Sequence, residues 1–233
     1  MDVKKIMAKQ GLNTEGYVPN AKDLPLLQGK PKILIDESAV DMFNAIKNGV
    51  KINNYNKVAQ ETSFILIGYE DTASGLIYIK RCIPAMQTFD VFTGSNFKSW
   101  DFVDKCVDIA QQFSDRGNPI IFFGHTHPAL YVTNKQGKNL PCESSNCWSS
   151  QDLISSYVYK SLYQDKVQVA DMLITPSLDI NTIYLETRKG VEGFYRFDAV
   201  LTYNKSKDCY EKEKSYSDIN APFVKLNPRE LDN

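Results

Sequence analysis

NPIIFFGHTHP, residues 118–128, is an apolar run that leads directly into two histidines. Such a run is typical of a buried β-strand, and Pro128 ends it because proline has no amide hydrogen for a ladder bond. His125 and His127 are the only histidines in the chain. Residues two apart on a strand point to the same face. We therefore expect both imidazoles to lie together at the exposed end of this strand.

The segments around this strand predict an α/β fold. Apolar residues recur at helical spacing in three segments, and short β-branched and aromatic runs predict further strands. The helices are expected over 37–48, where Gly49 ends the pattern, 99–116 and 149–164, and the other strands over 32–36, 61–70, 75–84, 169–176, 182–189 and 192–203. We expect helices flanking a mixed, mostly antiparallel sheet.

The histidine pair indicates a metal site. Zinc accepts imidazole and carboxylate ligands in a tetrahedral shell, and a catalytic zinc site has three protein ligands plus one water. The expected third ligand is Asp152, in the first turn of the helix that begins near Ser149. The same S-x-x-D spacing is typical of a helix N-cap, so Asp152 could serve only that cap. Beside the histidines we favour the metal ligand.

Glu61 is the candidate general base. A water at a catalytic zinc needs a group that accepts its proton. Glu61 opens the strand expected over 61–70, and an inward orientation would bury it beside the sheet. A glutamate at a strand start is more commonly a solvated edge residue, so this hypothesis depends on the histidine pair.

Three segments together resemble the motif of the JAMM (JAB1/MPN/Mov34) metalloproteases. They are E-x-x-x-x-x-x-G at Glu61–Gly68, G-H-T-H-P at Gly124–Pro128 and S-x-x-D at Ser149–Asp152, in the order that the family has. The resemblance covers roughly residues 32–190. It implies the JAMM/MPN fold, which is cytidine-deaminase-like.

The resemblance also implies a role for each motif residue. His125, His127 and Asp152 would bind one catalytic Zn²⁺. Glu61 would activate the water at the metal and pass its proton to the leaving amine, and Ser149 would help to stabilise the tetrahedral oxyanion. The implied enzyme is a zinc metalloprotease, a deubiquitinase-like isopeptidase that hydrolyses a peptide or isopeptide bond. The expected partner is ubiquitin or a ubiquitin-like protein, or its conjugate, cut after its C-terminus.

The chain departs from the family pattern in two places. The gap between the proline and the S-x-x-D serine, Ala129–Trp148, is longer than in much of the family. We expect an insertion over 129–147 that borders the site and could gate substrate or define specificity. Phe64 stands where many relatives have glycine, which bears on packing more than on the metal.

Cys142 and Cys147 lie inside this insertion. Two free thiols, a disulfide and a second metal site completed by carboxylates all stay open, and we favour free thiols. The chain has five cysteines, and an odd, scattered set fits reduced thiols better than a disulfide framework.

Other families explain the motifs less well. G-H-T-H also occurs in calcineurin-like metallophosphoesterases, but their two-metal site needs further histidines, which this chain lacks, and the H-E-x-x-H motif of zincins is absent. The main alternative is a non-catalytic MPN scaffold or binding module. Such modules have typically lost metal ligands, whereas all four polar positions are present here. A relative of the RadC-like branch is a third interpretation.

Composition limits the binding partners and the cellular location that we expect. Lys+Arg 27 against Asp+Glu 28 leaves no basic field for nucleic acid or an anionic membrane. The chain has no apolar run of the length of a signal peptide core or a membrane span, so we expect a cytoplasmic protein. We expect one catalytic domain over 32–203, an irregular arm over 1–31 that packs on it, and a polar tail over 204–233.

Overall fold

The computed structural model describes residues 5, 9, 24–27, 32–56, 59–90, 100–129, 131–133, 139–141, 148–188 and 191–214. Most of the expected arm, residues 215–233 of the expected tail, and Cys142 and Cys147 lie outside these residues. Among the helices that are described, none combines the length and the apolar character that crossing a membrane requires.

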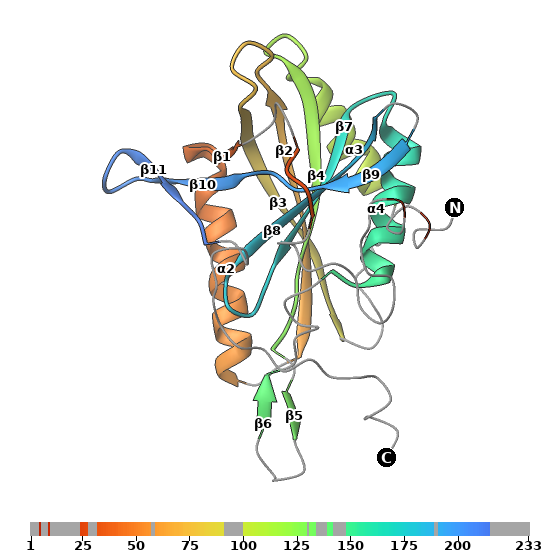
Figure 1. Ribbon diagram of the computed structural model, residues 1–233. Coiled ribbons are helices and arrows are strands. Elements are labelled where there is room, and N and C mark those ends of the chain that lie inside the picture. Colours follow the sequence, from red (N-terminus) through yellow and green to blue (C-terminus); the bar gives the residue numbers. More distant parts are fainter. Residues whose placement is uncertain are drawn as a thin grey trace.

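In the described part of the chain, three helices flank a curled nine-stranded sheet, and a two-stranded hairpin stands apart from it (Figure 1). The helices are α2 (Glu37–Asn56), α3 (Trp100–Gln111) and α4 (Ser150–Tyr163). The strands of the sheet are β1 (Lys32–Ile35), β2 (Gln60–Glu70), β3 (Ile77–Asp90), β4 (Asn118–Thr126), β7 (Gln168–Ile174), β8 (Ile180–Arg188), β9 (Val191–Tyr195), β10 (Ala199–Asn204) and β11 (Cys209–Lys212).

The strand order is β11-β10-β1-β3-β2-β4-β7-β8-β9. The pairs β1–β10, β1–β3 and β4–β7 are parallel, and the other pairs are antiparallel. The predicted α/β class with a mixed, mostly antiparallel sheet is confirmed. The single strand predicted over 192–203 is instead two strands, because the chain leaves the β8 edge after Tyr195 and rejoins the sheet beside β1 at Ala199.

Alternate residues of the central strands face opposite helices. The even-numbered apolar residues of β2 and β4 belong to one core with α2, and the odd-numbered ones belong to another core with α3 and α4. The first core includes Phe43, Phe64, Leu66, Ile120, Phe122 and Met172, and the second includes Ile65, Ile67, Val107, Ile121, Phe123 and Tyr159. The two helical layers are visible on either side of the sheet in Figure 1.

The sequence predicted that the helix beginning at Glu37 ends at Gly49. Helix α2 instead continues to Asn56. The buried side chains Val40, Phe43, Ile46 and Val50 keep helical spacing across the glycine. Glycine inside a helix costs only about 1 kcal/mol relative to alanine. Burial of Val50 therefore outweighs this local cost.

Strand β3 extends to Asp90, beyond the end predicted at Pro84. Strand β1 pairs only with Ile77–Ile79 of β3. Among the described residues, the part of β3 that contains Pro84 therefore has a paired strand, β2, on one side only. Proline is tolerated at such an edge because one row of backbone amides there has no strand partner.

The ends of the described chain pack against the sheet. Leu24 and Leu27 are buried, and the Arg196 side chain donates a hydrogen bond to the Leu24 carbonyl at 3.0 Å. At the other end, the boundary expected at residue 204 falls inside a hairpin, because β11 pairs antiparallel with β10. Just after this hairpin, Glu213 Oε2 forms an ion pair with Lys47 Nζ of α2 at 2.6 Å.

Candidate metal centre

The register of β2 and β4 positions the histidines. Ser63 of β2 lies opposite His125 of β4, and the Thr62 amide donates to the Thr126 hydroxyl at 2.9 Å. Just past the end of β4, the His127 amide donates to the Ile174 carbonyl at 3.0 Å. The backbone on both sides of the histidine pair is therefore held by neighbouring strands.

The side chains of His125 and His127 meet as the sequence predicted, but they are buried and not at an exposed strand end. Their Nε2 atoms are 3.1 Å apart, and each residue is less than a tenth exposed, at 9% and 8%. Both belong to the face of the sheet that carries α3 and α4, because His125 and Phe123 are two apart on β4.

Asp152 reaches this pair from the first turn of α4. Its Oδ1 lies 3.4 Å from His125 Nε2, and its Oδ2 lies 3.7 Å from His127 Nε2. It also completes a capping box: the Asp152 amide donates to Ser149 Oγ at 3.1 Å, and the Ser149 amide donates to Asp152 Oδ2 at 2.6 Å. The sequence offered cap and cluster as alternatives, and the structure combines them.

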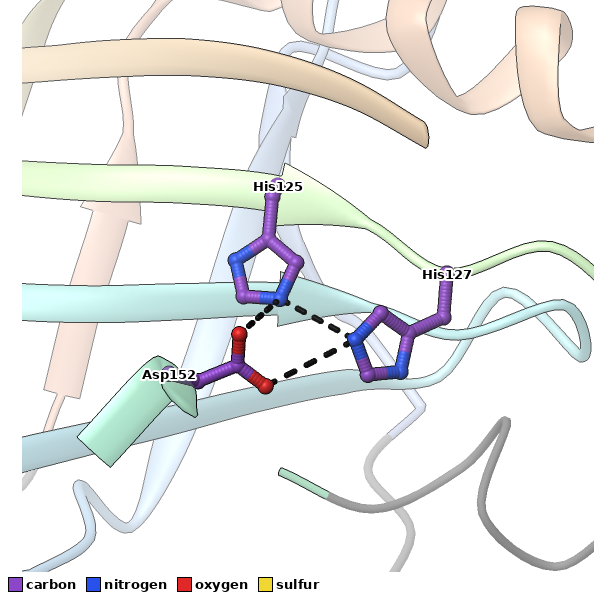
Figure 2. Close-up of side chains that lie close together, drawn as sticks. All are labelled: His125, His127 and Asp152. Carbon is purple, nitrogen blue, oxygen red and sulfur yellow. Dashed lines mark hydrogen bonds and ion pairs between the residues drawn. The ribbon is translucent and has the colours of Figure 1, made fainter. Parts of the chain in front are cut away.

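The three side chains form a compact group that could hold a metal ion, with ligand atoms all within 4.8 Å of one another (Figure 2). Figure 2 shows two imidazoles from the end of β4 and one carboxylate from α4 converging on a single point. Neutral imidazole nitrogens and carboxylate oxygens present lone pairs, and lone pairs that converge away from water need a cation or protons between them.

Electrostatics in the cluster favour an ionised carboxylate. Burial raises the pKa of Asp152, but the charges of His125 and His127 and their hydrogen bonds outweigh burial and lower it well below its usual value. Burial lowers the pKa of His125, and the negative charges of Asp152, Glu61 and Asp171 outweigh this and raise it. The cluster therefore holds a fixed negative charge beside two imidazoles.

Glu61 lies beside the cluster but is not one of its three members. It stands two residues before Ser63 on β2, so both belong to the face that carries the histidines. Burial raises the pKa of Glu61, the charges of His127 and His125 lower it, and that of Asp152 raises it. Glu61 therefore interacts electrostatically with all three members of the cluster. Its side chain is half-buried and not a fully solvated edge residue.

Ser149 is the N-cap residue of α4. Its Oγ accepts a hydrogen bond from the Asp152 amide, which leaves the hydroxyl hydrogen able to donate elsewhere. It is half-buried at the start of α4.

The structure adds three residues that the sequence did not assign to the site. Trp148 is buried, with its ring edge-on to His125 at 5.6 Å between centroids. Ser63 is buried opposite His125. Asp171 is buried on β7 and accepts a hydrogen bond from Ser156 of α4. A charged residue inside the apolar run 169–174 was the one sequence signal for Asp171.

Part of the expected insertion forms a hairpin of β5 (Tyr131–Thr133) and β6 (Asn139–Pro141). It protrudes beyond the sheet in Figure 1. The described cysteines Cys82, Cys106 and Cys209 are free thiols. Burial raises the pKa of Cys82 to about 12 and that of Cys106 to about 11, which makes both poor nucleophiles.

No protein-family model matches the chain, and no curated protein matches it with significance. The site therefore stands on its own geometry, which is that of a His-His-Asp group able to hold a metal ion at the end of β4.

Proposed function

We propose that this chain is a zinc-dependent hydrolase of the JAMM/MPN kind, which cleaves a peptide or isopeptide bond after the C-terminus of ubiquitin or a ubiquitin-like protein. His125, His127 and Asp152 would hold the zinc ion, and Glu61 would be the general base. The observation that carries the proposal is the convergence of the three ligand atoms beside Glu61.

The spacing of the ligand atoms fits zinc. A tetrahedral ion with bonds of about 2.0–2.1 Å has ligand atoms about 3.3 Å apart. The two histidine Nε2 atoms are 3.1 Å apart here, and each faces a different Asp152 oxygen, His125 facing Oδ1 at 3.4 Å and His127 facing Oδ2 at 3.7 Å, which is close to this spacing. Two imidazoles and a carboxylate are also a donor set that zinc accepts at catalytic sites, where the fourth position belongs to water or substrate.

A zinc ion bound there would polarise the scissile carbonyl and make a water more acidic. Glu61 would take the proton from the attacking water and deliver it to the leaving amine. Burial raises the pKa of Glu61, and a base with a higher pKa accepts a proton more readily near neutral pH. The Ser149 hydroxyl would donate to the oxyanion that forms on the substrate.

A row of exposed apolar side chains supports a protein substrate. Ile154, Val158 and Leu162 are exposed and lie four residues apart along α4, the helix that presents Asp152. A continuous apolar strip on a helix surface marks an interaction site more often than isolated apolar residues do. The strip lies on the side of α4 away from the face that presents Asp152, so it offers a docking surface to a folded partner such as a ubiquitin-like domain.

The first test is zinc stoichiometry. We would purify the protein without chelator and measure zinc per chain by elemental analysis in wild type, His127→Ala and Asp152→Ala. About one zinc per wild-type chain, lost in both variants, would support the site and justify a screen of ubiquitin-like fusions and isopeptide conjugates. Folded wild type that takes up no added zinc would overturn the proposal in favour of a non-catalytic MPN binding module.

A further inference from the structure

A hydrogen bond between α4 and β7 lies one helical turn beyond the metal ligand. The Ser156 hydroxyl donates to Asp171 Oδ2 at 2.5 Å. Both residues are buried, at 2% and 5% exposure. A distance of this length lies at the short end of the range for hydrogen bonds between oxygens.

The geometry of α4 links this bond to the metal centre. Asp152 and Ser156 are four residues apart, so they lie on the same face of the helix. The first faces the histidines of β4, and the second faces the neighbouring parallel strand β7. Asp171 pairs with Phe123, two residues before His125. The two polar contacts therefore fix the same face of α4 to two adjacent strands.

Packing alone does not require a carboxylate at position 171. Elsewhere α4 is held to the sheet by Lys160, whose Nζ donates to the Leu185 carbonyl at 2.7 Å, and by apolar packing. Leu153 and Leu173 share one buried cluster, and the Tyr159 ring stacks on Phe123 with centroids 3.9 Å apart. Apolar packing tolerates small rotations of a helix better than a directional hydrogen bond does. Burial raises the pKa of Asp171 to about 7, although the Ser156 hydrogen bond and the charge of His125 oppose that rise. An apolar residue would avoid this unfavourable burial, so the carboxylate points to another role.

We propose that Asp171 is a positioning residue of the metal centre: by accepting the Ser156 hydroxyl, it fixes the rotation of α4 that aims Asp152 at His125 and His127. This inference rests on the proposed zinc site. Groups that hydrogen-bond a metal ligand directly typically change metal affinity about 10- to 100-fold when they are removed, and Asp171 acts one step further out, through Ser156, so the lower end of this range is expected.

The test compares zinc affinity in four variants, by competition with a chromophoric chelator. Ser156→Ala removes the donor and Asp171→Leu removes the acceptor, whereas Asp171→Asn keeps an acceptor oxygen. Thr202→Val is the matched control. It removes a hydroxyl-to-carboxylate bond of the same length, 2.5 Å to Glu213, on β10, which three strands separate from β4. Unfolding of the metal-free proteins in urea would be measured in parallel.

We expect the zinc Kd to rise about 10-fold in Ser156→Ala and Asp171→Leu, and less than about 3-fold in Asp171→Asn. Thr202→Val should lose stability without a change in zinc Kd. Unchanged affinity in Ser156→Ala, or a loss in Asp171→Asn as large as in Asp171→Leu, would overturn the positioning role. Should Asp171→Leu not fold, Ser156→Ala decides, because it is the smaller change. Wild type that binds no zinc would instead overturn the metal site itself.

Discussion

The two faces of the central sheet are built from the same strands but differ at one end. On the α2 face, Phe64, Phe122 and Met172 continue an apolar core up to the level of the histidines. On the opposite face, the same strands change from Ile65 and Phe123 to a polar group under α4. Both faces therefore carry an apolar core, and the α3 and α4 face also carries the candidate chemistry where its apolar residues stop.

The largest expected effect tests the polar face. Glu61→Gln keeps the size of the side chain but cannot accept the proton, so we expect cleavage of a ubiquitin-like substrate to fall about 10²- to 10⁴-fold. Zinc per chain should stay at the wild-type value. Steady-state cleavage and elemental analysis measure the two quantities.

Glu70→Gln is the matched control, the same substitution at the opposite end of β2, about 30 Å away along the strand. Its activity per folded chain should stay close to wild type. Normal turnover by folded Glu61→Gln protein would remove Glu61 as the base and leave the face without an assigned proton acceptor.

The buried carboxyl of Asp171, on the same face, should make the free energy of unfolding depend on pH. Burial raises its pKa from the usual 3.8 to about 7, so the fold favours the protonated carboxyl. Its contribution to stability is complete below about pH 3.8 and is lost as pH rises through about 7. Asp171→Asn does not ionise, so between pH 4 and pH 8 the variant should gain up to about 4 kcal/mol relative to wild type.

Urea unfolding of the metal-free proteins at pH 4, 6 and 8 measures this difference. A difference that stays constant over the three pH values would show that Asp171 ionises in the folded protein as readily as in water.

A substitution on the α2 face should have a smaller effect, and it should change stability but not zinc binding. A methyl group at Gly124 would come within 2.2 Å of the Phe64 ring, which lies opposite it on β2. Gly124→Ala should therefore cost about 1–3 kcal/mol, and adding Phe64→Leu should recover part of the loss. Urea unfolding of the two single variants and the double variant measures this coupling.

Zinc per folded chain should be unchanged in all three proteins. If zinc binding falls together with stability, the two faces are not separable at this position.

The smallest expected change is a gain in stability on substituting Gly49 of α2. An added methyl group meets nothing within 4 Å, and the residue lies inside α2. Gly49→Ala should stabilise the protein by about 0.5–1 kcal/mol, because alanine favours the helix and restricts the unfolded chain. Thermal unfolding measures this change, and a loss of stability would mean that α2 is interrupted at Gly49 after all.

Local patterns predicted most elements of the fold but not how they associate. The β-branched and aromatic run in 61–70 and the apolar run of 118–126 identified β2 and β4, and their register is what brings Ser63 opposite His125. The split of 192–203 into β9 and β10 depends on partners far along the chain, which periodicity does not contain. Long-range pairing also explains why Asp171 was missed, because only the packing of α4 places Ser156 over it.

The phenylalanine that departs from the family pattern has a physical explanation. Phe64 lies opposite Gly124, whose missing side chain leaves room for the ring. The sequence indicated that this departure concerned packing, and the position of the ring on the α2 face agrees with that interpretation. The coupling of a large residue on one strand with a glycine on the next could not be deduced without the register.

The double duty of Asp152 has an evolutionary consequence. Because the S-x-x-D segment caps α4 as well as facing the histidines, we expect selection for folding to retain it even in a descendant that binds no metal. The two histidines have no comparable second task among the contacts described. A lineage that drifts toward a purely structural role should therefore lose His125 and His127 first and keep the serine and the aspartate.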